Sequence, residues 1–182
     1  MKWASSSLEQ GKEGQSLAWY RPGEKIKTER PVEDVKLNCW AGISYRGATS
    51  LEIFRENLRA TVYQPILERH MPEMQELYPD GYSFIHDNHQ AHAAVEAWMR
   101  NNHLEQEPFP SYSPDLNIIE NLWSALKDRV AGDAPRTENQ LVNSLRRNWE
   151  ILTTSENLQS YFHSLHTRYL ECIEENGARL PY

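Results

Sequence analysis

The chain has 182 residues, a net charge of −7 and 39% hydrophobic residues, which fits one domain over 1–182 with a single core. It contains no long apolar run and no apolar stretch near its start, so we expect neither a membrane span nor secretion. The acidic balance argues against a protein that coats DNA through bulk positive charge. Cys39 and Cys172 lie far apart, which predicts reduced thiols, no zinc site and a nuclear or cytoplasmic location.

The first part of the chain combines a polar stretch with a region of strand character. Residues 1–30 are polar, with a turn signal at residues 21–24. Apolar and β-branched residues then become frequent from Val35 to Ile43, and two glycines bracket residues 43–46. This pattern predicts two strands joined by a tight turn.

The middle of the chain changes period. Residues 51–77 repeat apolar positions at helical spacing, and Pro65 is expected to interrupt that helix. A short strand is predicted over residues 82–87, after a turn signal. A second helix is predicted over residues 91–101, with inward-facing residues Ala94, Ala97 and Trp98.

The last part of the chain is predicted to be helical. A stiff loop with three prolines leads into a helix over residues 118–130, and two more helices are expected in residues 137–175. Strands followed by alternating strand and helix indicate the α/β class, with a mixed central sheet flanked by helices. The apolar stripe of the first of these helices is Ile119, Leu122, Trp123, Leu126 and Val130.

Two acidic residues lie where chemistry is often placed. Asp87 ends the predicted strand, and the ends of strands in α/β sheets commonly present ligands. Glu120 follows the proline-rich loop and enters the first turns of a helix. Two carboxylates held in this way can bind Mg²⁺, which prefers oxygen ligands. A pair of such ions activates the attacking oxygen and stabilises the leaving oxygen in phosphoryl transfer.

Each of these residues also has an ordinary structural interpretation. An aspartate at a strand end is more often a turn or capping residue, and a glutamate early in a helix favours the positive end of the helix dipole. Asp115 or Asn117 is expected to be the N-cap of that helix, with no catalytic meaning. Histidines beside turns are common at protein surfaces, and three of them flank the strand end: His86, His89 and His92.

The segment at residues 113–123 resembles the signature of the mariner superfamily of DDE transposases. It reads Ser-Pro-Asp-Leu-Asn-Ile-Ile-Glu-Asn-Leu-Trp, and the family has its third catalytic acid at the position of Glu120. Asp87, followed by Asn88 and then His92, is similar to the element of the second acid. Weaker similarities lie elsewhere in the chain, at residues 19–24, 40–44 and 168–182, so the resemblance covers nearly the whole sequence.

The resemblance implies an RNase H-like fold and a metal-dependent reaction on DNA. In the family, Mg²⁺ or Mn²⁺ supports cleavage of DNA strands and joining of a 3′-hydroxyl to target DNA. The implied partners are transposon-end and target DNA, with a homodimer allowed and with neither a membrane nor a small-molecule cofactor. Asp87 and Glu120 would be the catalytic and metal-binding residues, and the supporting residues would be Asn88, His92, Asp115, Asn117 and Asn121.

The main departure concerns the first of the three acids. The family places that aspartate on the first strand, where this chain has Ala4, or Ser5 in the next register, and neither has a carboxylate. Glu9 is an available substitute, but it is better matched to a non-catalytic acid. The resemblance also indicates no counterpart of the family's N-terminal helix-turn-helix region.

These departures predict a degenerate or domesticated transposase domain, or an incomplete fragment of one, with little or no DNA cleavage by the chain alone. One alternative is a non-catalytic module that keeps the fold and binds DNA or protein. A remoter alternative is an unrelated acidic globular protein.

Overall fold

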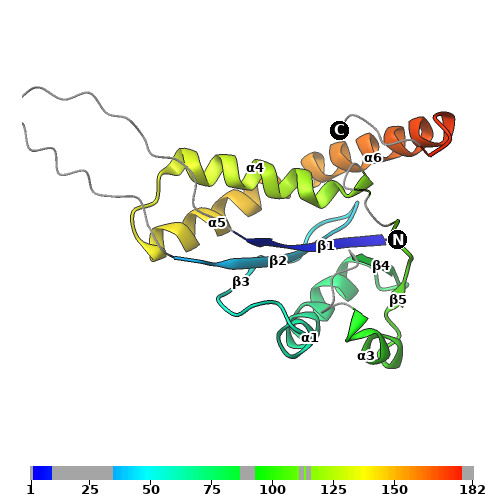
Figure 1. The fold of residues 1–182 in the computed structure, drawn as a ribbon, viewed down its shortest axis with the longest axis horizontal. Helices are drawn as coiled ribbons and strands as arrows, with labels where there is room; N and C mark the ends of the chain where they lie inside the picture. The colour runs from blue at the N-terminus through cyan, green and yellow to red at the C-terminus, as the bar shows by residue number, and fades with distance from the viewer. Residues whose placement is uncertain (1, 10–34, 87–92, 111–112, 114–115, 178–182) are drawn as a thin grey trace, which may run out of the picture.

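A five-stranded mixed sheet lies at the centre of the chain (Figure 1). The computed structural model describes residues 2–9, 35–86, 93–110, 113 and 116–177, with residues 2–9 described through their backbone pairing. The strand order is β3-β2-β1-β4-β5. The strands are β1 (Lys2–Glu9), β2 (Asn38–Ile43), β3 (Glu52–Phe54), β4 (Ser83–His86) and β5 (Glu105–Gln106).

Strand β1 is the centre of this sheet and has a neighbour on each side. It pairs antiparallel with β2, with Ala4 opposite Ile43, and parallel with β4, with Ala4 opposite Ile85. β3 extends the sheet antiparallel beyond β2, and β5 extends it parallel beyond β4. The polar composition of β1 does not predict this central position in the sheet, because a central strand is normally recognised by a continuous apolar run.

Helices cover both faces of the sheet, as Figure 1 shows. The side chains of Cys39, Ala41 and Ile43 pack in one core with the long helices, and Trp40 and Phe84 pack in a second core on the other face. This alternation follows from the two-residue period of a strand. The first face carries α4 (Ile118–Asp133) and α5 (Glu138–Leu152), and α6 (Ser155–Glu174) packs against the same core. The second face carries α1 (Ala60–Leu77) and α3 (Glu96–Asn101).

The predicted hairpin and the first predicted helix were partly wrong. Residues 35–46 contain one strand, β2. A turn follows it and is closed by hydrogen bonds between Ser44 and Gly47. The partner strand β3 comes later, inside the range predicted as helix, and α1 begins at Ala60. Apolar residues of β3 fall by chance at helical spacing with those of α1, but Phe54 pairs with Asn38 at the sheet edge.

Two details of the helices on the second face also differ from expectation. Pro65 does not end α1, which continues through it and through Pro72. Helix packing outweighs the loss of two backbone donors, because five α1 side chains on one stripe are buried. In the region of α3, Val95 and Met99 are buried and the half-buried Trp98 packs against the second core as predicted, whereas Ala94 and Ala97 are exposed, so the predicted inward face was wrong for the two alanines.

The C-terminal helices agree with the prediction. The apolar stripe of α4 is buried as expected, and Trp123 stacks on Trp149 of α5 with ring centroids 5.1 Å apart. The Trp149 indole N–H donates to the carbonyl of Thr49 at 2.9 Å, which ties α5 to the turn between β2 and β3. The Thr137 hydroxyl accepts from the Gln140 amide and caps α5.

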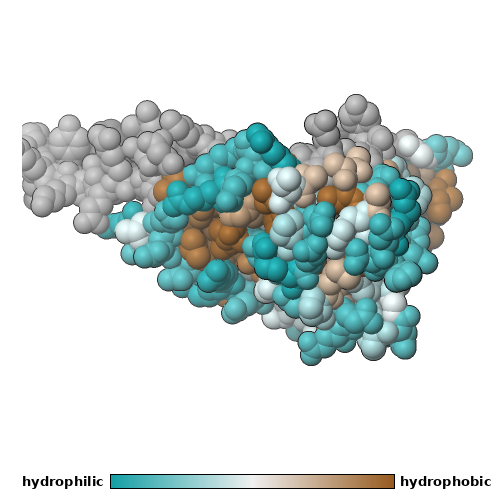
Figure 2. All heavy atoms as spheres, turned by 90° about the horizontal axis from the view of Figure 1, so that it is seen from below, coloured by the Kyte–Doolittle hydropathy of each residue, from teal (hydrophilic) through white to brown (hydrophobic). Residues whose placement is uncertain are grey.

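The far end of α6 leaves the body of the domain. Tyr169, Leu170 and Ile173 are exposed there, with Ile173 at 73%, and Figure 2 shows apolar surface at that end.

Neither Cys39 nor Cys172 forms a disulfide, and burial raises the pKa of the Cys39 thiol to about 12. None of the described helices is both long and apolar enough to cross a bilayer.

Candidate functional site

Glu120 lies in the first turn of α4 and is exposed, although the two residues before it, Ile118 and Ile119, are buried. This follows from the position of Glu120 outside the apolar stripe that packs on the sheet. Asn117, at the N-cap position, is only 6% exposed. Its amide nitrogen donates to Glu120 Oε1 at 3.2 Å instead of capping the helix. The predicted N-cap residue therefore also orients the candidate catalytic carboxylate.

The next residue of α4 is held by the C-terminal helix. Arg168 of α6 is 7% exposed, and its Nη1 donates to Oδ1 of Asn121 at 3.1 Å. A buried arginine is unusual unless it is hydrogen bonded. This contact joins α6 to the turn that carries Glu120. The sequence indicates Asn121 through the motif, but the part played by Arg168 depends on a contact across 47 positions that no local pattern shows.

The last residue of β4 is the histidine that precedes Asp87. His86 is the last residue of β4, and its ring stacks on Tyr63 with centroids 6.2 Å apart. Its Nε2 lies 2.6 Å from the side-chain nitrogen of Gln106. His86 therefore belongs to the packing against α1 and β5. The other predicted residues of this segment and loop lie outside the described residues: Asp87, Asn88, His89, His92 and Asp115.

The register of β1 assigns position 4 to a face. Ala4 is opposite Ile43, and Ile43 packs in the core beneath α4 and α5, so position 4 belongs to the α4 face. Ser5 is opposite His86 and belongs to the other face. Glu9 is five residues further along, about 17 Å from position 4. Three positions are candidates for the first acid: 4, 5 and 9. Only position 4 is both on the face of the sheet that α4 covers and beside the end of β4.

The side chains of Glu120 and Ala4 do not fit a site for two metal ions. Glu120 is a carboxylate on the α4 face, but the alanine at position 4 has no oxygen to donate. Among the described residues, no group of three or more His, Cys, Asp or Glu side chains is placed to hold a metal ion. A clamp of two ions depends on carboxylates that contact both ions. Position 4 therefore offers no side-chain oxygen that could join Glu120 in such a site.

Solved structures share this fold. The catalytic domain of Mos1 mariner transposase matches with a TM-score of 0.75 and 18% identity, over 98% of this chain and 83% of that one. The Mos1 mariner paired end complex with Mn matches with a TM-score of 0.75 and 20% identity, over 97% of this chain and 55% of that one. At these identities the likeness shows the fold, which is the predicted RNase H-like α/β architecture.

Sequence relatives include transposases of nematode transposable elements. The Tcb2 transposase of Caenorhabditis briggsae is 27% identical over 147 residues, covering 79% of this chain and 52% of that protein. The Tc1 transposase of Caenorhabditis elegans is 31% identical over 104 residues, covering 56% of this chain and 38% of that protein. This chain thus spans about half or less of the length of these two relatives.

The family match covers most of the chain. The sequence pattern of the family described as DDE superfamily endonuclease matches residues 6–142, well over half of the chain. This range includes β2 to α4 and therefore Glu120, and it begins after Ala4. The chain belongs to the DDE superfamily of endonucleases.

Proposed function

We propose that this chain is a DDE-type domain descended from a transposase that cleaves DNA strands and joins a 3′-hydroxyl to target DNA, and that it has lost most of this activity. The observation that carries the proposal is the register of β1. Position 4 lies beside the end of β4 and on the face of α4, where a first carboxylate is needed, and it is an alanine.

The retained part of the site supports the transposase origin. Glu120 is exposed at the start of α4 and is oriented by Asn117, and the buried Arg168–Asn121 contact supports the same turn. Asp87 directly follows β4 in the sequence and is proposed as the second carboxylate. We expect the carboxylates of Asp87 and Glu120 to lie close enough to share one metal ion, Mg²⁺ or Mn²⁺.

DNA is the proposed partner, and its contacts would be local. The net charge of −7 excludes tight binding through bulk charge alone. Mos1 has been crystallised as a paired end complex and as a strand transfer complex, which supports DNA as the ligand of this fold. Phosphate groups near Glu120 would then be recognised by individual donors such as arginine and hydroxyl groups.

The experiment is a plasmid-nicking assay with Mn²⁺ on four proteins: the natural chain, Glu120→Gln, Ala4→Asp, and Ala4→Asp combined with Glu120→Gln. We expect background nicking by the natural chain, clear nicking by Ala4→Asp, and background again for the double variant. Robust nicking by the natural chain that Glu120→Gln abolishes would refute the loss of activity. Nicking by Ala4→Asp that survives Glu120→Gln would refute the assignment of Glu120.

A second candidate function is a module that keeps the fold and binds a partner without catalysis. The exposed apolar end of α6, with Leu170 and Ile173, favours it, because large exposed apolar side chains that cluster often mark interaction surfaces. Sedimentation of the natural chain and of Ile173→Asp distinguishes the two functions. Self-association lost in Ile173→Asp, together with no nicking by Ala4→Asp, would favour the module.

A further inference from the structure

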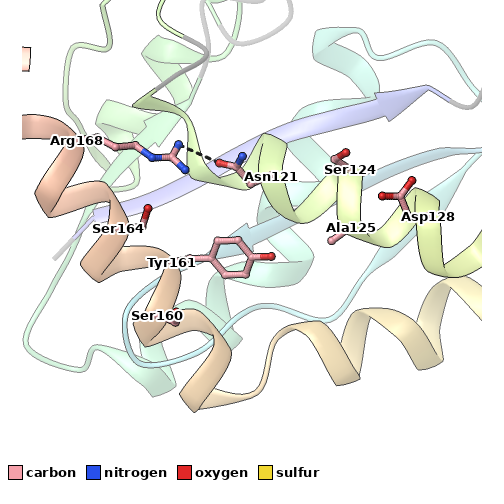
Figure 3. Close-up of a pocket in the computed structure, with 8 residues that line it drawn as sticks. All are labelled: Asn121, Ser124, Ala125, Asp128, Ser160, Tyr161, Ser164 and Arg168. Atoms are coloured by element: carbon pink, nitrogen blue, oxygen red, sulfur yellow. Dashed lines mark hydrogen bonds between the residues drawn. The ribbon is translucent and has the colours of Figure 1, made fainter. Parts of the chain in front are cut away.

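A groove of about 500 Å³ lies between α4 and α6 and begins beside the turn that carries Glu120 (Figure 3). Most of its lining side chains are polar and uncharged, and it has one positive and one negative residue. Helix α4 contributes Asn121, Ser124 and Asp128, and α6 contributes Ser160, Ser164 and Arg168.

We propose that this groove binds a phosphate group of a DNA strand at its Arg168 end and so guides the strand past Glu120. The proposal rests on the DNA-directed function above and adds a defined binding site to it. Hydroxyl, amide and guanidinium groups are the donors that proteins use for phosphate oxygens. They contact the backbone and not the bases, so the groove would bind DNA without sequence preference.

Arg168 is the anchor of the proposed site. The residue is 7% exposed as a whole yet lines the groove, and its guanidinium is already oriented by the bond to Asn121. A planar guanidinium with a fixed orientation suits phosphate recognition, because little side-chain freedom is lost on binding. The Asn121 contact also places the anchor next to the turn of Glu120, so a bound phosphate would lie near the candidate catalytic residue.

The distribution of charge along the groove selects one end. Asp128 lies seven residues after Asn121 on α4, which corresponds to about 10 Å along the helix. Figure 3 shows Asp128 at the opposite end of the groove from Arg168. At physiological salt, the exposed carboxylate of Asp128 is largely screened from a phosphate at that separation. A phosphate at the Arg168 end is therefore compatible with Asp128, whereas one in the middle of the groove would be repelled.

The test is an NMR titration of the ¹⁵N-labelled natural chain with a short single-stranded oligodeoxynucleotide, in EDTA so that metal-dependent binding is absent. We expect the amide signals of Asn121, Ser124 and Ser164 to shift together on one binding curve. Inorganic phosphate serves as a second probe, and it should shift the same signals more weakly because it has no neighbouring phosphates.

The discriminating variant is Ser164→Glu, and Gln159→Glu is its matched control. Both add one negative charge to α6, but Gln159 is exposed outside the groove lining. We expect Ser164→Glu to weaken oligonucleotide binding about tenfold, as for the loss of a charged hydrogen bond, and Gln159→Glu to weaken it by at most about twofold. If Ser164→Glu is unfolded by its melting curve, Ser160→Glu, which is exposed, replaces it.

Three results would overturn the proposal: no shift of groove signals, equal weakening by the groove variant and the control, or binding of inorganic phosphate without binding of the oligonucleotide. The last result would reduce the groove to a site for small anions. Because binding is measured without metal, groove binding can be present even if Ala4→Asp fails to nick DNA. In that case the assignment of position 4 as the lost carboxylate fails and the groove assignment stands.

Discussion

The first turn of α4 and position 4 of β1 lie on the same face of the sheet, yet only the first turn of α4 retains its functional group. Glu120 keeps its carboxylate, and it is supported by Asn117 and by the contact between Arg168 and Asn121. Position 4 keeps its place in the strand register, opposite Ile43, but it has no functional group.

This fold does not depend on the functional groups of its candidate site. The sheet is held by backbone pairing and by two apolar cores, and Glu120, the candidate catalytic residue within the described part of the chain, belongs to neither core. A first carboxylate can therefore be lost without loss of the architecture. The comparison also implies that residues of α4 only a few positions apart should differ widely in their contribution to stability.

The largest effect is expected at the core side of α4. Trp123 is 4% exposed and stacks on Trp149, so Trp123→Ala should lower the free energy of unfolding by about 3–5 kcal/mol. Urea unfolding measures this change. The half-buried Trp98 provides the matched control, and Trp98→Ala should cost about 1–2 kcal/mol. Equal costs at the two sites would show that α4 is not packed as described.

An intermediate effect is expected for a carboxylate with a structural role. Glu73 of α1 accepts hydrogen bonds from the amide and hydroxyl of Ser50 and lies 3.0 Å from the His70 ring. Burial by itself would raise the pKa of Glu73, but these hydrogen bonds and the charge of His70 hold it below its ordinary value of 4.5. Glu73→Gln should lower the free energy of unfolding at neutral pH by about 1 kcal/mol or less, because the side chain is partly exposed.

The pH dependence of Glu73 follows from the direction of that shift. A carboxyl with a lowered pKa in the folded state stabilises the fold above its ordinary pKa, and that contribution is lost as the pH falls through the folded value. Unfolding measured from pH 7 down to pH 3 should therefore show a smaller acid-induced loss for Glu73→Gln than for the natural chain. An identical pH profile for the two proteins would contradict the structural role of this carboxylate.

The smallest effect on stability is expected at Glu120. Its side chain is exposed, so Glu120→Gln should change the free energy of unfolding by no more than about 0.5 kcal/mol. The same denaturation measurement used for Trp123→Ala checks this. A cost above about 2 kcal/mol would mean that Glu120 supports the fold, and the separation of site and core would be wrong.

Local sequence patterns predicted the regular parts of this fold. The stripe of α4 and both later helices follow a single period over many residues, and they were confirmed. β1 and β3 were missed in the residue pattern because one is polar and the other has three residues and merges with a helical period. In the site, the motif indicated Glu120, and Asp87 stays a prediction. The Arg168–Asn121 contact could not be predicted, since it joins distant helices.

The most direct test of position 4 as the lost ligand is a thermal melt of Ala4→Asp with and without excess Mn²⁺. A restored carboxylate beside the end of β4 should repel the other acids and lower the melting temperature without metal, and Mn²⁺ should raise it by about 5 °C. The natural chain and Ser5→Asp, which places the acid on the opposite face, should shift by less than about 1 °C. Equal shifts in Ala4→Asp and Ser5→Asp, or a shift that survives Glu120→Gln, would contradict the assignment of position 4 as the lost ligand.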